Sequence, residues 1–287
     1  MKKICVVSGK GGVGKSTITA SLSLILSKKY NIVCADCDVD ASNLSLLLGK
    51  EESINQKRLS TNEIAKIDYS NCNNCGRCAQ ACYFNAIQFE QRSTIIEEKC
   101  EGCGTCKLVC KNNAITLEAV ENATIQKMTT TFGFDVVSAQ LDMGKGGSGK
   151  IVNEVKNITG YYDADLMLID CPAGTGCPVI ASVNDCDYAV IVTEPSKTAF
   201  SDMKRAIKIL RHFDIPFGAV LNKADINPAQ KSVFYQFFKQ ENIEIIEQIG
   251  YNDAFKESLI AGQPAIAYEP LLKNNFNRIG NHIITYI

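Results

Sequence analysis

Residues 9–16 read Gly-Lys-Gly-Gly-Val-Gly-Lys-Ser and match the phosphate-binding pattern G-x4-G-K-[ST]. An apolar run at 3–8 precedes them, and residues 15–29 follow with apolar side chains at helical spacing. A glycine-rich loop between a strand and a helix directs backbone N–H groups at phosphate. Lys15 is expected to reach the outer phosphates and Ser16 to bind Mg²⁺. The residues predicted to contact nucleotide here are Gly9, Lys10, Gly11, Gly12, Val13, Gly14, Lys15, Ser16 and Thr17.

The pattern around this loop predicts a parallel sheet. A second apolar run at 31–35 ends in Asp36-Cys37-Asp38, so strand, loop, helix and strand form a βαβ unit. Further buried strands are predicted at 133–137, 165–169, 188–192, 217–221 and 244–249, and helices at 148–159, 198–212, 228–240 and 274–287. The predicted fold is therefore α/β, a mostly parallel P-loop sheet covered by helices.

Residues 62–118 interrupt this alternation with an internal repeat. NCNNCGRCAQACYFNAIQFE, at 71–90, aligns with KCEGCGTCKLVCKNNAITLE, at 99–118. The segment has too little apolar material for its own core, so we expect bound metal to stabilise it. The predicted organisation is a discontinuous ATPase domain, 1–61 and 119–287, with a ferredoxin-like α+β domain inserted at 62–118.

Each copy of the repeat contains C-x2-C-x2-C-x3-C, the run that binds iron–sulfur clusters. Three cysteines of a run hold one 4Fe–4S cluster and the fourth serves the other. The predicted sets are Cys72, Cys75, Cys78 and Cys110 for the first cluster, and Cys100, Cys103, Cys106 and Cys82 for the second. The arrangement resembles the bacterial two-cluster ferredoxin, with Tyr83 and Lys111 where proline is usual. Zinc is the less favoured alternative, because its sites usually consist of two separated pairs.

Net charge, cysteine content and the two ends of the sequence limit the partners and the cellular location that we expect. The formal net charge is −1, which gives no basic field for nucleic acid. The apolar stretch near the start, residues 4–7, is too short for a secretory signal, and 14 cysteines in a non-secreted chain indicate metal or redox work. The final residues lack the basic amphipathic helix of membrane-attached proteins. We therefore expect a cytoplasmic protein with no nucleic-acid partner and no stable membrane association.

Lys10 makes the phosphate loop more specific. The form KGGxGKST, at 10–17, resembles the deviant Walker A loop of the MinD/ParA ATPases, and the whole chain is similar to their branch with an inserted ferredoxin domain. The nitrogenase iron protein is related. The resemblance implies a dimer formed over ATP, either a homodimer or a heterodimer with a paralogue, in which Lys10 contacts the partner's phosphates.

The same resemblance assigns the switch residues. Asp38, in DCDVDASN, matches the aspartate that positions the attacking water, and Asp36 and Asn43 also match that motif. Asp170, in LMLIDCPAG, matches the aspartate that holds Mg²⁺ through water, and Gly174 fits the second switch. The implied Mg²⁺ ligands are Ser16, Asp38 and Asp170, and the implied catalytic residues are Lys10, Lys15, Asp38 and Asp170.

Three further features leave alternatives open. Residues 222–225, Asn-Lys-Ala-Asp, resemble the guanine-reading N-K-x-D, but the family uses Asn222 for adenine, so ATP is favoured over GTP. Cys177 lies seven residues after Asp170, as does a bridging cysteine of the nitrogenase iron protein; a redox or metal role competes with that of a small core residue. The glycine-rich stretch 144–150 has Ile151 where a hydroxyl is required, and is predicted to be a flexible loop.

The predicted function is that of an ATPase, slow without a partner, that couples nucleotide state to electron transfer through two 4Fe–4S clusters. Its partner would be a redox or metallocofactor protein. One alternative is an ATPase that assembles or carries iron–sulfur clusters or other metallocofactors. A second alternative is a positioning ATPase whose clusters are only structural.

Overall fold

A nine-stranded sheet forms the main body in the computed structural model, which describes residues 1–49 and 54–287. The strand order is β13-β12-β11-β1-β10-β2-β9-β8-β3. All neighbours from β13 to β9 are parallel, whereas β8 pairs antiparallel with both β9 and β3. The strands are β1 (Lys2–Ser8), β2 (Ile32–Asp36), β3 (Ile54–Leu59), β8 (Ala123–Thr129), β9 (Asp135–Leu141), β10 (Leu166–Ala173), β11 (Tyr188–Thr193), β12 (Phe217–Leu221) and β13 (Ile245–Gln248).

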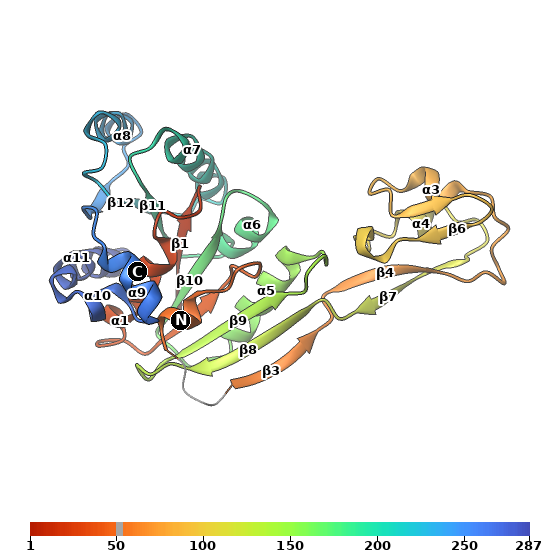
Figure 1. Ribbon diagram of the computed structural model, residues 1–287, viewed down its shortest axis with the longest axis horizontal. Coiled ribbons are helices and arrows are strands. Elements are labelled where there is room, and N and C mark those ends of the chain that lie inside the picture. Colours follow the sequence, from red (N-terminus) through yellow and green to blue (C-terminus); the bar gives the residue numbers. More distant parts are fainter. Residues whose placement is uncertain (50–53) are drawn as a thin grey trace.

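Helices cover both faces of the parallel part, which is why its central strands are mostly apolar and buried (Figure 1). One face packs against α5 (Ser148–Thr159), α6 (Cys177–Val183), α7 (Lys197–His212) and α8 (Pro228–Gln240). The other packs against α1 (Lys15–Leu26), α2 (Leu44–Leu47), α9 (Ala254–Ala261), α10 (Ala265–Tyr268), the 3₁₀ turn Pro270–Leu272 and α11 (Lys273–Ile284). Strand β1 shows the alternation, with Cys5 facing the first layer and Ile4 the second.

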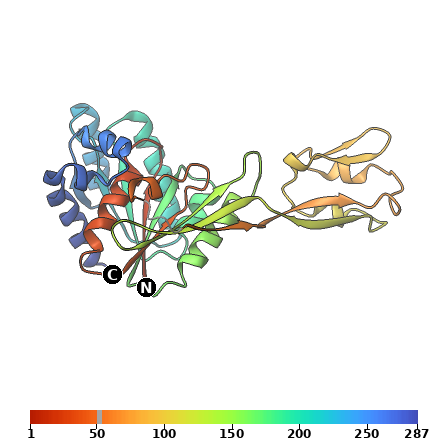
Figure 2. The same ribbon diagram turned by 60° about the horizontal axis from the view of Figure 1, so that its bottom comes forward.

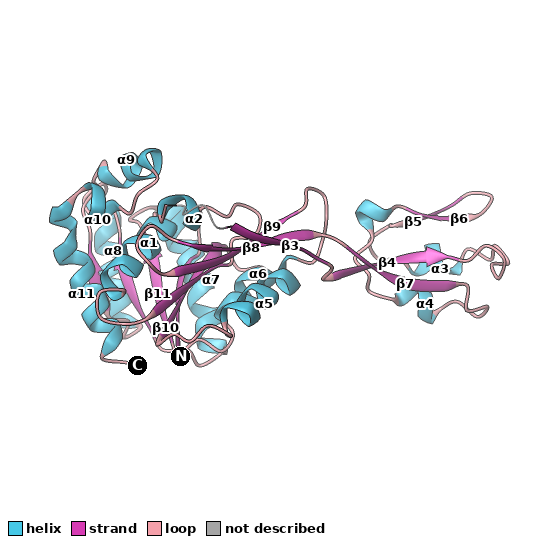
Figure 3. Cartoon of the chain, turned by 90° about the horizontal axis from the view of Figure 1, so that it is seen from below, coloured by secondary structure: helices cyan, strands magenta, loops and turns pink. Residues whose placement is uncertain are grey.

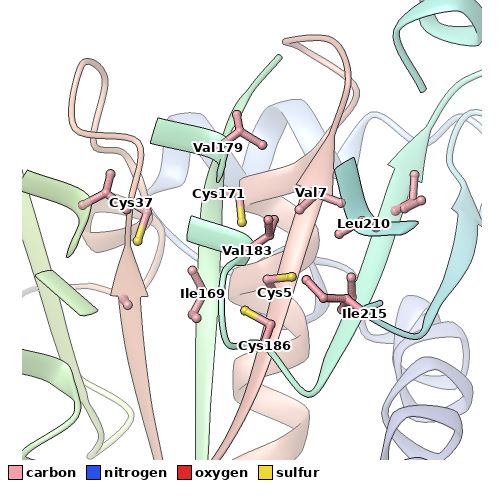
Figure 4. Packing of buried hydrophobic residues seen from close by; sticks show 14 of the residues in the cluster. Cys5, Val7, Cys37, Ile169, Cys171, Val179, Val183, Cys186, Leu210 and Ile215 are labelled. Atoms are coloured by element: carbon pink, nitrogen blue, oxygen red, sulfur yellow. The ribbon is translucent and has the colours of Figure 1, made fainter. Parts of the chain in front are cut away.

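Five cysteines outside the repeat are buried and serve as small core residues, as their sequence neighbourhoods predict: Cys5, Cys34, Cys37, Cys171 and Cys186. Figure 4 shows Cys5, Cys171 and Cys186 among apolar side chains such as Val183.

The expected elements and the observed ones differ mainly at the sheet edge. The predicted parallel strands and long helices are present within a few residues, although α1 ends at Leu26 rather than residue 29. Strand β9 begins at Asp135 because Gly133 has a left-handed φ of 84° in the preceding turn. Strands β3 and β8 were not predicted, since INQKRL and ATIQKMT mix polar and apolar residues as a half-exposed antiparallel edge does.

The repeat segment leaves this edge on a two-stranded stalk and projects away from the body (Figures 2 and 3). The chain runs from β3 into β4 (Asn62–Ile67) and returns through β7 (Ile115–Val120) into β8; β4 and β7 pair antiparallel. Between them lie α3 (Arg77–Ala81), β5 (Ile87–Phe89), β6 (Ser93–Ile95), a 3₁₀ turn at Glu97–Lys99 and α4 (Thr105–Leu108). One apolar cluster of this segment is formed by the buried residues Ala65, Cys78, Ile87, Cys106 and Ile115.

Within the described ranges, no helix has the length and apolarity that crossing a membrane requires.

Candidate nucleotide and cluster sites

The phosphate loop joins β1 to α1 and depends on two kinds of glycine. Gly12 and Gly14 have left-handed φ values of 79° and 93°, which residues other than glycine rarely adopt. Gly9 is required for a close approach instead, because a Cβ there would lie 2.2 Å from the backbone of Asp202 in α7. The start of the loop therefore packs against α7, and its end leads into α1.

A buried ion pair lies at the base of this loop. Lys15 Nζ is 2.7 Å from Asp170 Oδ1, and Thr19 Oγ1 donates to the same oxygen at 2.9 Å. Burial opposes the charge on Lys15, but the Asp170 carboxylate outweighs it and the pKa of Lys15 lies above its ordinary value. Asp170 Oδ2 is buried without a hydrogen-bond partner in residues 1–49 and 54–287. A buried carboxylate oxygen that lacks a donor fits the acceptor expected for a water bound to Mg²⁺.

Asp36 organises the loop that carries Asp38. It lies opposite Asp170 in the register of β2 and β10, and its carboxylate accepts from the Asp38 N–H (3.1 Å), Ser42 Oγ (2.7 Å) and the Leu44 N–H (2.9 Å). Burial and then the charge of Asp170 raise the pKa of Asp36 to about 7. Asp38 lies two residues beyond the end of β2 at Asp36, whereas Asp170 lies within β10, which continues to Ala173.

Glu194 connects two lysines beside the loop and was not predicted from the sequence. Its carboxylate accepts from Lys10 Nζ at 3.0 Å and from Lys223 Nζ at 2.8 Å. Lys223 Nζ also donates to the Gly12 carbonyl at 3.1 Å. Burial opposes ionisation of Glu194, but the two lysines prevail and its pKa lies below the ordinary value. Lys10 is therefore held by its own chain in this structure.

A pocket beside the loop has one polar wall and one aromatic wall. Asn222 is buried there, and its Nδ2 donates to the Val13 carbonyl at 2.8 Å while its Oδ1 accepts from the Lys223 N–H. Asp225 Oδ1 accepts from the Tyr251 N–H at 2.7 Å. The Asn222 amide is thus already bonded to the phosphate loop. The pocket is lined by Gly12, Gly14, Thr17, Asn222, Lys223, Tyr251, Asn252, Phe255, Lys256 and Leu259.

The eight repeat cysteines line two cavities in the projecting segment, four in each. The lining of one includes Cys72, Cys75, Cys78 and Cys110, and the lining of the other includes Cys82, Cys100, Cys103 and Cys106. The fourth cysteine of each run thus joins the three of the other copy. Backbone N–H groups of Ala65, Ala86 and Ala114 point at the sulfurs of Cys100, Cys82 and Cys110, at 3.4, 3.2 and 3.3 Å.

The donor chemistry of both cavities fits an iron–sulfur cube. Four thiolates with N–H donors aimed at them are the surroundings that such clusters use. In the described part of the chain, no three His, Cys, Asp or Glu side chains are arranged around a single metal ion. Zinc would need its sulfurs at about 2.3 Å from one ion, whereas the thiolates of a cube bind separate irons.

Cys177 is the first residue of α6 and is exposed. It lies beside Gly149 of α5, where a Cβ would be 3.5 Å from Cys177 Cβ. Residues 144–147 lead into α5, and Gly147 has a left-handed φ of 94°. The stretch 144–150 thus forms the start of a helix and the loop before it.

Comparison with known proteins gives concordant results. A family model for the CobQ/CobB/MinD/ParA nucleotide-binding domain matches residues 4–265. An uncharacterized protein of Methanocaldococcus jannaschii is 40% identical, over 78% of this chain and 79% of that protein. An iron-sulfur cluster carrier protein of Pyrococcus horikoshii is 24% identical, over 93% of this chain and 80% of its own. The septum site-determining protein MinD from Pyrococcus horikoshii, solved with Mg-ADP, has a TM-score of 0.59 at 21% identity and covers 98% of this chain and 95% of that one.

Proposed function

Because the chain belongs to the CobQ/CobB/MinD/ParA family of nucleotide-binding domains, we propose that it is an ATPase whose nucleotide state controls electron transfer through two 4Fe–4S clusters. The observation that carries this proposal is the pair of four-cysteine cavities on a stalk attached to the nucleotide-binding sheet. The ATPase domain would comprise 1–61 and 119–287, and the ferredoxin-like insert 62–118. The partner would be a redox protein.

The residues around the phosphate loop supply what phosphoryl transfer requires, which is positioning and charge stabilisation. Lys15 would exchange the Asp170 carboxylate for the phosphates of ATP. Asp170 and Ser16 would then hold Mg²⁺, which neutralises phosphate charge when bound, and Asp38 would complete the site and orient the attacking water. The Mg-ADP in the MinD of Pyrococcus horikoshii supports a site of this kind.

Lys10 would act in a dimer formed on ATP. It lies at the start of the loop, and its ion pair with Glu194 leaves 36% of its side chain exposed, so it needs no unfolding to reach outward. In the proposed dimer it leaves Glu194 and contacts the phosphates of the partner subunit.

In the insert, eight thiolates would hold the clusters, in the two sets that line the cavities. When bound, such clusters accept and release single electrons. The N–H groups of Ala65, Ala86 and Ala114 donate to three of the sulfurs and stabilise their negative charge, which favours the reduced state. Cys177 is exposed beside α5 and is retained as a candidate redox ligand.

Assembly or transport of iron–sulfur clusters is the second candidate function. The similarity to an iron-sulfur cluster carrier protein over 93% of this chain favours it. The two functions differ in what happens to the iron, because an electron carrier keeps its clusters while a carrier protein gives them up.

Anaerobic redox titration with and without MgATP tests the main proposal. A nucleotide-dependent shift in midpoint potential, or in the rate of reducing an acceptor, is the expected result. Loss of iron to an apo-acceptor, without such a shift, would support the carrier function instead. The variant Lys15→Ala is the control, because it should lose nucleotide binding and the nucleotide-dependent shift while keeping its brown colour.

A competition experiment tests the base. Asp225 Oδ1 is bonded to the Tyr251 N–H, so the carboxylate that would read guanine in an N-K-x-D protein has one of its two acceptor oxygens already engaged, and Asn222 Nδ2 is bonded to the Val13 carbonyl beside the pocket. ATP should therefore displace a fluorescent nucleotide at lower concentration than GTP. Tighter binding of GTP would contradict the assignment of Asn222 to an adenine pocket.

A further inference from the structure

The two copies of the cysteine repeat are not equivalent in their packing. Asn74 and Gly102 occupy matching positions with left-handed φ values of 56° and 63°. Asparagine tolerates that conformation, but a Cβ at Gly102 would lie 2.3 Å from the Glu63 carbonyl oxygen of β4. Only the loop of the second copy, residues 100–103, therefore demands glycine, because it is pressed against the stalk.

The same loop also touches the nucleotide-binding body. A Cβ on Gly146 would lie 2.6 Å from Glu101 Oε2, so the Glu101 carboxylate rests against this glycine. The Gly146 carbonyl accepts from Asn122 Nδ2 at 3.0 Å, and Asn122 Oδ1 accepts from the Thr61 N–H at 3.0 Å. Asn122 is fully buried where both stalk strands meet the sheet. The corresponding residue of the first copy, Asn73, lines the first cavity as Glu101 lines the second, but it has no carboxylate.

From Gly146 the contacts continue to the nucleotide site. Residues 144–147 lead directly into α5, and Gly149 in its first turn backs onto Cys177 at the start of α6. Helix α6 begins three residues after Gly174, whose φ is 101°, and Gly174 follows the strand that contains Asp170. Figures 1 and 3 show α5 on the side of the body from which the stalk leaves. A continuous set of contacts thus joins Asp170 to Glu101.

We propose that residues 144–149 link the nucleotide site to the second cysteine site alone, formed by Cys82, Cys100, Cys103 and Cys106. This inference rests on the proposed function. Helices that pack together transmit small shifts as rigid bodies. Displacement of the residues that follow Asp170 in the sequence would therefore move α6, then α5, and finally Gly146. Glu101 follows Cys100 directly, and displacing its carboxylate changes the negative charge beside that site. Less negative charge there favours the reduced state.

Hydrogen exchange of the anaerobic cluster-loaded protein tests the link, with MgADP compared against a non-hydrolysable MgATP analogue. We expect exchange to change in segments 171–177, 144–149 and 99–104, and to stay constant in 71–76. A change at 171–177 without one at 99–104 would overturn the link and leave the proposed function standing. No change at 171–177 would overturn both, and an equal change at 71–76 would overturn the selectivity.

Two variants sharpen the test. Gly146→Ala should push the flexible Glu101 side chain aside without straining the backbone, because Gly146 is not in the left-handed region. It should abolish the nucleotide response at 99–104 while keeping that at 171–177. Glu101→Gln should raise the midpoint potential of one of the two clusters, which a titration monitored by electron paramagnetic resonance measures. The matched control is Glu90→Gln, at an exposed glutamate of the insert that lines neither cysteine cavity, which should leave the exchange response and both midpoint potentials unchanged; if it behaves like the other variants, the proposal is wrong.

Discussion

Lys15 and Asp170 form a buried pair whose members depend on each other. Both side chains are more than nine-tenths buried, and their charged atoms are 2.7 Å apart. Removal of one member of a buried pair leaves an uncompensated charge, which typically costs about 3–5 kcal/mol. Lys15, which would bind phosphate, and Asp170, which would hold Mg²⁺, therefore also stabilise the nucleotide-free fold.

The double-mutant cycle of this pair is the first prediction. Lys15→Ala without nucleotide should lower the free energy of unfolding of the body by about 3–5 kcal/mol, and Lys15→Ala with Asp170→Asn should recover about half of that loss. Urea unfolding at neutral pH, followed by circular dichroism, measures the effect. Lys150→Ala, at an exposed lysine, is the control. Strictly additive effects of the two substitutions would show that the pair does not interact in solution.

At this scale, the sequence predicts site residues that one local motif contains and misses contacts between distant segments. The phosphate-loop pattern identifies Lys15 because its spacing reflects one local turn. Glu194 lies 184 residues from Lys10 and directly follows an ordinary apolar strand, so no local pattern separates it from a turn-forming acid. Asp36 carries a weak signal, since it is a carboxylate at the end of a fully buried strand.

At the scale of elements, the contact between the phosphate loop and α7 should be sensitive to a single methyl group. The second prediction compares Gly9→Ala with Gly11→Ala. The first places a Cβ 2.2 Å from the Asp202 backbone, which cannot move without shifting α7, and should cost about 1–3 kcal/mol or more. The second meets only Ala173 Cβ at 4.0 Å and should stay within about 0.5 kcal/mol. Thermal unfolding compares them, and equal midpoints would contradict the close approach.

The predicted elements were found where burial is uniform. Strands of the parallel sheet are covered on both faces, so their apolar runs stand out from the surrounding sequence. The antiparallel edge was not predicted, because the adjacent polar residues Gln126 and Lys127 interrupt the buried positions of β8 and resemble a loop. The two-stranded stalk likewise lacks a strong pattern, since Asn62, Glu63 and Lys66 interrupt β4.

At the scale of the whole molecule, we expect the insert, but not the body, to depend on bound clusters for its core. Two of the five residues in the buried apolar cluster of the insert are themselves cysteines. The third prediction is that removal of iron with a chelator under reducing conditions makes amides at 72–110 exchange rapidly, while β1 and β10 remain protected. Hydrogen exchange before and after reconstitution with iron and sulfide measures this. Persistent protection at 72–110 without iron would mean that the segment folds by packing alone.

The fourth prediction concerns the independence of the body. In the register of β3 and β8, Leu59 lies opposite Ala123, and the Asn122 N–H donates to the Leu59 carbonyl at 2.9 Å. Replacing residues 61–121 with Asn-Gly would therefore close the two strands with a two-residue hairpin turn. Among the described residues, those between 60 and 122 contribute to neither core cluster of the body.

The shortened protein should accordingly be monomeric and colourless without nucleotide, lose no more than about 1–2 kcal/mol of stability, and bind ATP within about threefold of the full chain. Circular dichroism and isothermal titration calorimetry make the comparison, with the cluster-loaded full chain as control. Asn122 is kept because its side chain bonds the Gly146 carbonyl, which holds the loop before α5. Aggregation of the shortened chain, or loss of ATP binding, would show that the insert is part of the nucleotide-binding fold and that the stalk is needed to stabilise the sheet.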